Sequence, residues 1–186
     1  MAAEDVNGVL LGAGEVYMYE FDGTTIPEDS EIETDAHNVG HCSGGFSIDY
    51  KPEVYDVKNQ YNKIVKRFII SEACTAKTGI LTWDLEKLAL LSTAKFTKTD
   101  ATSTEKEKRK LVVGGSNNSL KTVLFRFVHE KADGNKLRFT MIGQGGNGFA
   151  LEFTTKELTV DATIEAIEHI KNFLFSLEEE IGTVTV

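Results

Sequence analysis

A glycine-rich run, GQGGNG at residues 143–148, matches the pattern G-x-G-x-x-G. In dinucleotide-binding proteins such glycines let the backbone approach a pyrophosphate at the start of a helix. Here the run is followed by Phe149, Leu151 and Phe153, which alternate with other residues as they do in a strand. Because the motif has to open a helix, we interpret the run as a glycine-rich hairpin turn and not as a nucleotide site.

The side chains that bind transition metals or act as nucleophiles are few and scattered. None has C-x-x-C or H-x-x-x-H spacing, and no G-x-S-x-G elbow marks a nucleophile. Cys74 lies within a predicted strand, where a packing role is expected. We therefore predict no metal, no cofactor and no enzyme activity. The metal-binding types considered are His37, His41, Cys42, Cys74, His129 and His169.

Composition limits the remaining classes of protein. The chain has 186 residues, 41% of them hydrophobic, which is enough for one sizeable core, so a single domain over residues 1–186 is expected. Its net charge of −9 argues against tight, sequence-independent binding to nucleic acid. The longest apolar runs are far too short to span a bilayer. Two cysteines and a start without a secretory signal predict a reducing cytosol.

Alternating apolar residues predict that strands dominate the fold. The clearest region is a three-stranded antiparallel meander over about residues 121–155, whose first strand is apolar on both faces. Turns at Asp133-Gly134 and within residues 144–148 join its strands. Two further strands are predicted upstream, at residues 15–21 and 62–73.

Helical spacing is clear in one place. Leu85, Leu88 and Ala89 follow Thr82 and Asp84, either of which can cap a short helix over residues 84–92. Residues 161–180 have mixed spacing that suits either a helix or two strands. Long loops are predicted at residues 22–39, 51–62 and 96–109, the last of them mobile, and residues 1–14 are predicted to form an N-terminal arm.

Several segments, in order, resemble the phage tail tube proteins, which are the major tail proteins of long-tailed phages. LLGAGEVY at residues 10–17 and GGFSIDYKPE at 44–53 are similar to the opening and first sheet of that family. EAC at 72–74, Trp83 with the short helix, LRFTM at 137–141 and LEF at 151–153 are similar to its middle and late strands. The family ends with a further strand pair, so we favour strands at residues 160–168 and 173–179.

The resemblance implies an antiparallel β-sandwich or partly closed barrel with one short flanking helix. It also implies a homohexameric ring, with rings stacked into the hollow tail tube of a virion assembled in the bacterial host cytoplasm. A tape-measure protein would fill the lumen during assembly, and DNA would later pass without specific binding. The inner tube of a contractile tail, inside a sheath, or of a tail-like bacteriocin is a related interpretation.

Two sets of site residues follow from the resemblance. The loop at 51–62 would contact the next ring through Val54, Tyr55, Val57 and Tyr61. Basic residues that face the lumen would need acidic neighbours, because unpaired Lys and Arg would hold DNA. We expect Arg126 beside Glu130, and Arg138 in a strand paired with the one that carries Glu152.

A stand-alone β-sandwich module that binds carbohydrate or protein is the alternative from another class. Such a module is expected to carry an exposed aromatic platform. Trp83 is expected to be buried beside the helix start. The candidate aromatic residues are Tyr17, Tyr19, Tyr50, Tyr55, Tyr61 and Trp83.

Overall fold

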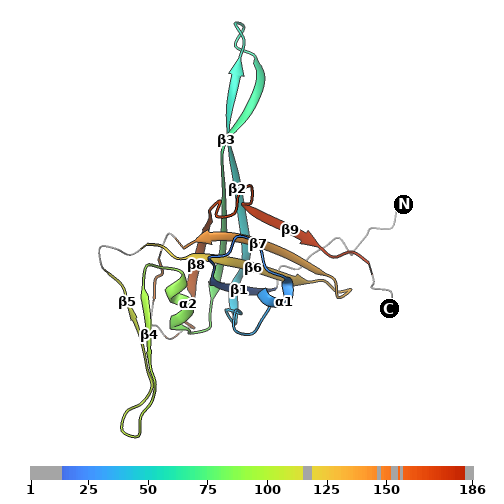
Figure 1. Ribbon diagram of the computed structural model, residues 1–186. Coiled ribbons are helices and arrows are strands. Elements are labelled where there is room, and N and C mark those ends of the chain that lie inside the picture. The colour runs from blue at the N-terminus through green and yellow to red at the C-terminus, as the bar shows by residue number, and fades with distance from the viewer. Residues whose placement is uncertain (1–13, 115–118, 146–147, 152–154, 156, 183–186) are drawn as a thin grey trace.

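A computed structural model describes residues 14–114, 119–145, 148–151, 155 and 157–182 (Figure 1). This part of the chain is mainly β, and its strand pairings are all antiparallel, which confirms the predicted fold class. The described strands do not close a barrel. The elements are β1 (Glu15–Glu20), α1 (Asp29–Ile32), β2 (Cys42–Lys58), β3 (Ile64–Ile80), α2 (Leu85–Leu90), β4 (Lys95–Thr99), β5 (Lys108–Val112), β6 (Thr122–Glu130), β7 (Lys136–Gln144), β8 (Val160–Ala166) and β9 (Phe175–Glu179).

Seven strands form one sheet in the order β1-β6-β7-β8-β3-β2, and β9 pairs with β7 beside this path. The strand β7 is the branch point. Its first half pairs with β9, and its last two residues, Gly143 and Gln144, pair with β8. From there β8, β3 and the base of β2 pack over β1, β6 and β7: Phe46 of β2 stacks on Phe127 of β6 with ring centroids 4.2 Å apart. The outcome is a sandwich-like body.

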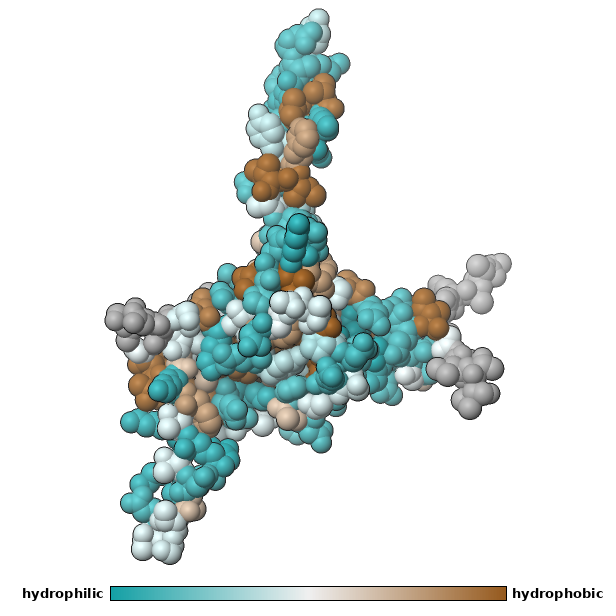
Figure 2. All heavy atoms as spheres, viewed as in Figure 1, coloured by the Kyte–Doolittle hydropathy of each residue, from teal (hydrophilic) through white to brown (hydrophobic). Residues whose placement is uncertain are grey.

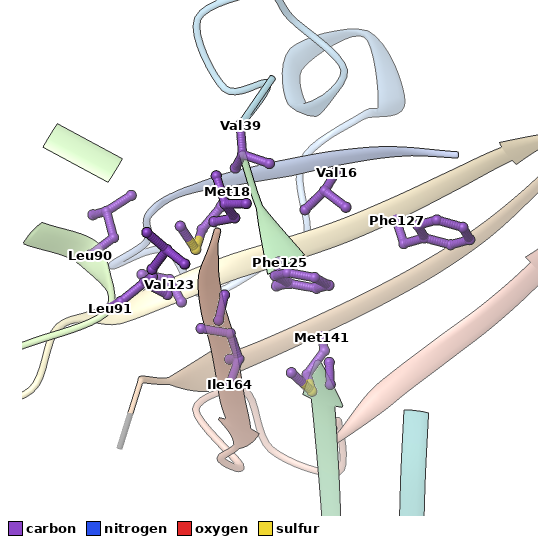
Figure 3. Close-up of a cluster of buried hydrophobic side chains, with 14 of the residues drawn as sticks. Val16, Met18, Val39, Leu90, Leu91, Val123, Phe125, Phe127, Met141 and Ile164 are labelled. Atoms are coloured by element: carbon purple, nitrogen blue, oxygen red, sulfur yellow. The ribbon is translucent and has the colours of Figure 1, made fainter. Parts of the chain in front are cut away.

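The main hydrophobic core lies between these two layers (Figure 3). Val123, Phe125 and Phe127 of β6 point into it, as their alternation predicts. Met141 of β7 and Ile164 of β8 are fully buried in the same cluster. These apolar contacts fix the body from which the other elements project.

The second face of β6 is buried as well. Leu124 and Val128 pack in a smaller cluster with Ile32 of α1, beneath the segment at residues 22–39. A strand that is apolar on both faces is stable only when both faces are buried, and residues 22–39 bury the second face of β6. The predicted long loop therefore contains a short helix, α1, that the sequence analysis did not predict.

The meander is confirmed for two of its three strands. β6 and β7 pair antiparallel, and Gly134 in the turn between them has φ of +82°, a conformation that glycine adopts without a Cβ clash. The prediction of the third strand is wrong at residues 149–151, which form no strand. Residues 152–154 lie outside the described residues. β8 and β9 occupy the free edge of β7 instead, so the preference for two strands at residues 160–179 is confirmed.

The predicted helix at residues 84–92 is confirmed as α2. The side chain of Asp84 accepts a hydrogen bond of 2.9 Å from the backbone N–H of Glu86, as expected of an N-cap. Trp83 is not buried as predicted: half of its surface is exposed. Helices α1 and α2 have four and six residues, and no helix among the described residues is long and apolar enough to cross a membrane.

Candidate assembly surface

Strands β2 and β3 continue together well beyond the body (Figure 1). β8 pairs with β3 only as far as Thr75. From there outward, β2 and β3 pair only with each other among the described residues. We call residues 49–74 the arm. The prediction of a loop at 51–62 is wrong, because residues 51–58 belong to β2 and only a turn lies beyond them. Pro52 is tolerated because β2 is an edge strand.

The tip of the arm is a tight turn at residues 59–63. The side-chain oxygen of Asn59 accepts hydrogen bonds from the backbone N–H groups of Tyr61 and Lys63, at 3.0 and 3.1 Å. Asn62 has φ of +59°, a left-handed conformation that Asn adopts more readily than most residues. The sequence therefore closes the hairpin locally, without help from the body.

The arm carries apolar side chains on both faces. Tyr55 lies opposite Phe68 on one face, and Val54 lies opposite Ile69 on the other. A register shift between Glu53 and Val54 leaves Ile70 as the extra residue of a bulge. At the base of the arm Cys74 is buried and Tyr50 contacts Phe175. Beyond the base, neither face is buried against the rest of the described subunit.

Exposure of these apolar residues is high. Tyr55 is 60% exposed and Tyr61 74%, and the bulge residue Ile70 is 59% exposed. Nine of the sixteen exposed large apolar residues in the described part of the chain belong to the arm. Figure 2 shows hydrophobic patches along this projection. The nine residues are Tyr50, Val54, Tyr55, Tyr61, Ile64, Val65, Phe68, Ile69 and Ile70.

Polar contacts on the arm join its own two strands. Arg67 donates a hydrogen bond of 2.8 Å to Asp56 across the hairpin, and Ser71 donates one of 3.0 Å to Glu53. These exposed pairs hold the register and add little stability. They leave the apolar residues between them facing solvent.

The arm also presents unpaired strand edges. Among the described residues, β2 has no partner on its outer edge, and β3 has none on its outer edge from Ile64 to Cys74. At the arm's base a groove of about 540 Å³ runs beside β3. Ile69 and Ile70 line one side of it, and Phe173 and Leu174, from the β8–β9 connection, line the other. Ser71, Glu72, Glu168 and Asn172 also line this groove, so its lining is mixed. The free strand edges are the feature typical of a surface that pairs with another chain.

The four predicted contact residues all lie on the arm. Val54, Tyr55 and Tyr61 are exposed, and Val57 is half-buried. The β3 side of the surface, where Phe68, Ile69 and Ile70 are exposed, was not among the predicted contact residues. The signal was present, because three consecutive large apolar residues cannot all face one core from a single strand.

The predicted pair of Arg126 with Glu130 is wrong. Arg126 and Arg138 are buried in the subunit, beneath α1. Arg126 pairs with Asp29 and Glu33 and not with Glu130. The strand of Arg138 pairs with β6, β8 and β9, and the predicted partner residue Glu152 lies outside the described residues.

Glu33 is the centre of this buried charge cluster. Its carboxylate lies 2.6 Å from Arg138, 2.9 Å from Lys136 and 3.3 Å from Arg126. Burial opposes ionisation of Glu33, but hydrogen bonds from Arg138 and Lys136 outweigh it and hold the pKa of that carboxyl below its ordinary value. The cluster neutralises two buried arginines and fastens α1 to the sheet, so neither arginine is an exposed lumen residue of this subunit.

The remaining chemistry candidates do not converge. Within the described residues no three His, Cys, Asp or Glu side chains come together as a metal site. Burial raises the pKa of the Cys74 thiol in the core. Gly143 and Gln144 of the glycine-rich run end β7 and open no helix. A Cβ at Gly145 would lie 2.7 Å from the backbone oxygen of Leu91, so close packing accounts for that glycine.

The aromatic candidates are dispersed. Tyr17 is buried, and Tyr19 stacks on His37 with ring centroids 4.0 Å apart. Tyr55 and Tyr61 lie towards the tip of the arm, and Trp83 lies before α2. They form no single platform among the described residues. No protein-family model matches the chain, and no curated protein matches it.

Proposed function

We propose that the chain is a structural protein that assembles with copies of itself into rings stacked as a hollow tube, like the phage tail tube proteins it resembles. The ring is a hexamer, and the tube is the tail tube of a virion assembled in the cytoplasm of a bacterial host. A tape-measure protein occupies the lumen during assembly, and DNA passes through it at infection. In a contractile tail the tube would lie inside a sheath. The inner tube of a tail-like bacteriocin is the related alternative.

The observation that carries the proposal is the exposed apolar surface of the arm. Soluble monomers seldom expose contiguous apolar patches of this kind unless a partner covers them. Tyr55, Phe68 and Ile70 stand on a hairpin that projects from the body, and no described part of the chain buries them. A neighbouring copy would cover both faces of the arm at once.

The strand edges support a self-assembling partner. A long exposed edge such as β2 invites pairing with any extended chain, and natural proteins usually block it. Heterologous contacts between identical subunits, in which one surface binds a different surface of the next copy, close rings when the rotation allows. Assembly would satisfy the edges and bury the apolar faces in the same step.

The direct test is to shorten the arm. Glu53 and Ser71 are cross-strand partners, so residues 54–70 can be replaced by Asn-Gly, which closes a two-residue hairpin. We expect a folded subunit with unchanged far-ultraviolet circular dichroism per strand residue, and no rings or tubes by negative-stain microscopy. The parent chain is expected to form them.

The matched control shortens the other hairpin. Thr99 and Lys108 are partners in β4 and β5, so residues 100–107 can be replaced by the same Asn-Gly turn. This variant is expected to assemble like the parent. Tubes from the shortened-arm variant would contradict the proposal. A parent chain that stays monomeric at high concentration would favour the alternative, a β-sandwich binding module that uses Tyr55 and Tyr61 of the arm to hold another protein.

A further inference from the structure

The hairpin of β4 and β5 is a second projection, and its charge is opposite to that of the chain. Residues 95–112 contain six basic and three acidic side chains, a net charge of +3. The whole chain has −9, so the remainder carries −12. The predicted mobile loop at 96–109 is wrong in part, because residues 96–99 and 108–109 belong to these strands.

One face of this hairpin is neutralised by its own acids. Lys98 and Arg109 are cross-strand partners, and both pair with Glu107, at 3.5 and 2.7 Å. Leu111, on the same face, packs against the main core at the base. This face therefore packs on the body at its base and has little net charge to offer a partner.

The opposite face is basic and outward. Lys95, Lys108 and Lys110 share it with Thr97 and Thr99. Lys95 and Lys110 are exposed and make no ion pair with any described residue, and Lys108 reaches only Glu105 of the adjoining loop. Neither strand has a second partner among the described residues. The basic face, as we call it, is an unpartnered sheet face with a row of lysines.

The opposite end of the body is acidic. Four exposed carboxylates at this end make no ion pair with any described residue. They come from α1 and its N-cap, from the end of β6 and from β9, and we call them the acidic end. They are Glu28, Glu31, Glu130 and Glu178.

The two charged surfaces lie at opposite ends of β6 and β7. Both hairpin strands pack on α2, and Leu91 after that helix contacts Gly145, just past the last residue of β7. Glu130 ends β6, and Glu178 of β9 lies opposite Arg138 in the strand register, near the start of β7. A strand of nine residues spans about 30 Å, so one subunit cannot bring the two surfaces together. Figure 1 shows the hairpin on one side and α1 with β9 on the other.

We infer that the basic face docks on the acidic end of a second copy of this chain. The inference rests on the proposed self-assembly and names the surfaces that orient it. Such a contact is head-to-tail, because each copy offers the basic face on one side and the acidic end on the other. Complementary exposed charges steer encounter and select the register, and salt weakens them.

Charge reversal with complementation tests the pair of surfaces. We expect Lys95→Glu with Lys110→Glu to lower the self-association constant about tenfold at low salt, measured by sedimentation velocity. Glu28→Lys with Glu178→Lys is expected to do the same. An equimolar mixture of the two variants restores association, because each reversed face then meets an oppositely charged end.

The controls separate this inference from the proposed function. Lys77→Glu with Lys171→Glu makes the same change in net charge as Lys95→Glu with Lys110→Glu, at exposed sites outside both surfaces. It is expected to leave association unchanged. Parent-like association of the reversed variants, or a mixture that fails to recover, would overturn the docking inference. The shortened-arm variant decides the proposed function independently.

A nucleic-acid partner gives a different result. If a fluorescently labelled DNA duplex binds the parent, and Lys95→Glu with Lys110→Glu abolishes that binding while self-association is unaffected, the basic face serves nucleic acid and the inference is wrong. We expect no measurable binding of the duplex at physiological salt, because the remainder of the chain carries −12.

Discussion

The arm and the β4–β5 hairpin have the same architecture and opposite surfaces. Each is a two-stranded antiparallel projection (Figure 1), yet the arm exposes nine large apolar residues and the hairpin, within its strands, only Val112. A charged ribbon is stable in water with weak, screened ion pairs. An apolar ribbon remains soluble only when something covers it. In the proposed assembly we therefore expect the arm to make a tight, dry contact and the hairpin a weaker, salt-sensitive one.

The largest effect is expected at the root of the arm. Phe46 of β2 stacks on Phe127 and lies 5.8 Å from the ring centroid of Phe125. Phe46→Ala removes these contacts and is expected to lower the free energy of unfolding by about 3 kcal/mol. Urea denaturation of dilute protein measures it. A loss below about 1 kcal/mol would mean that the arm is not anchored through this ring.

A second prediction separates assembly from stability within the arm. Tyr55→Ser with Phe68→Ser removes a cross-strand aromatic pair that is exposed in the subunit. We expect association to weaken about a hundredfold, because buried aromatics dominate interfaces. The free energy of unfolding should change by less than about 1 kcal/mol.

The matched change in the hairpin is Lys98→Ser with Arg109→Ser, also a cross-strand pair. It removes the self-neutralised face and leaves the basic face intact. We expect association by sedimentation to change less than about threefold. Equal losses from the two double variants would mean that the apolar and charged projections do not differ in role.

What the sequence could predict depended on how local the determining contacts are. The alternation of Val123, Phe125 and Phe127 is a local pattern, and it placed β6 correctly with both faces buried. The cap of α2 by Asp84 is equally local. Both follow from neighbours in sequence, which single-sequence patterns contain.

The partners of the buried arginines depended on distant residues. Arg126 pairs with Asp29, 97 residues away, because α1 folds over the sheet, and no spacing rule connects the two. The β3 half of the arm follows the strand predicted at residues 62–73, but the β2 half was missed for a different reason. Pro52 and the charged residues around it are typical of a loop, and only pairing with β3 makes this segment a strand. Exposure of its apolar residues followed from the length of that pairing.

A third, smaller effect concerns the tip of the arm. Asn62 adopts a left-handed conformation, which costs a residue with a Cβ about 1 kcal/mol. Asn62→Ala is therefore expected to fray the tip and weaken association modestly, while Asn62→Gly keeps it. Amide hydrogen exchange at Tyr61 and Lys63 is the measurement. Equal protection in the two variants would show that the turn does not depend on this conformation.

The smallest effect is expected in the hairpin on acidification. A hydrogen bond from Arg109 and the nearby charge of Lys98 hold the pKa of Glu107 below its ordinary value. A carboxyl whose pKa is lower in the folded state stabilises the hairpin above its unfolded pKa. That contribution is lost as pH falls through the folded pKa. NMR titration should therefore show Glu107 changing charge at lower pH than a free glutamate. Arg109→Ser is expected to move that midpoint upward while the resonances of the arm stay unchanged. An unmoved midpoint would show that the ion pair does not persist in solution, and the hairpin would then present more free positive charge to a partner than its strand pairing indicates.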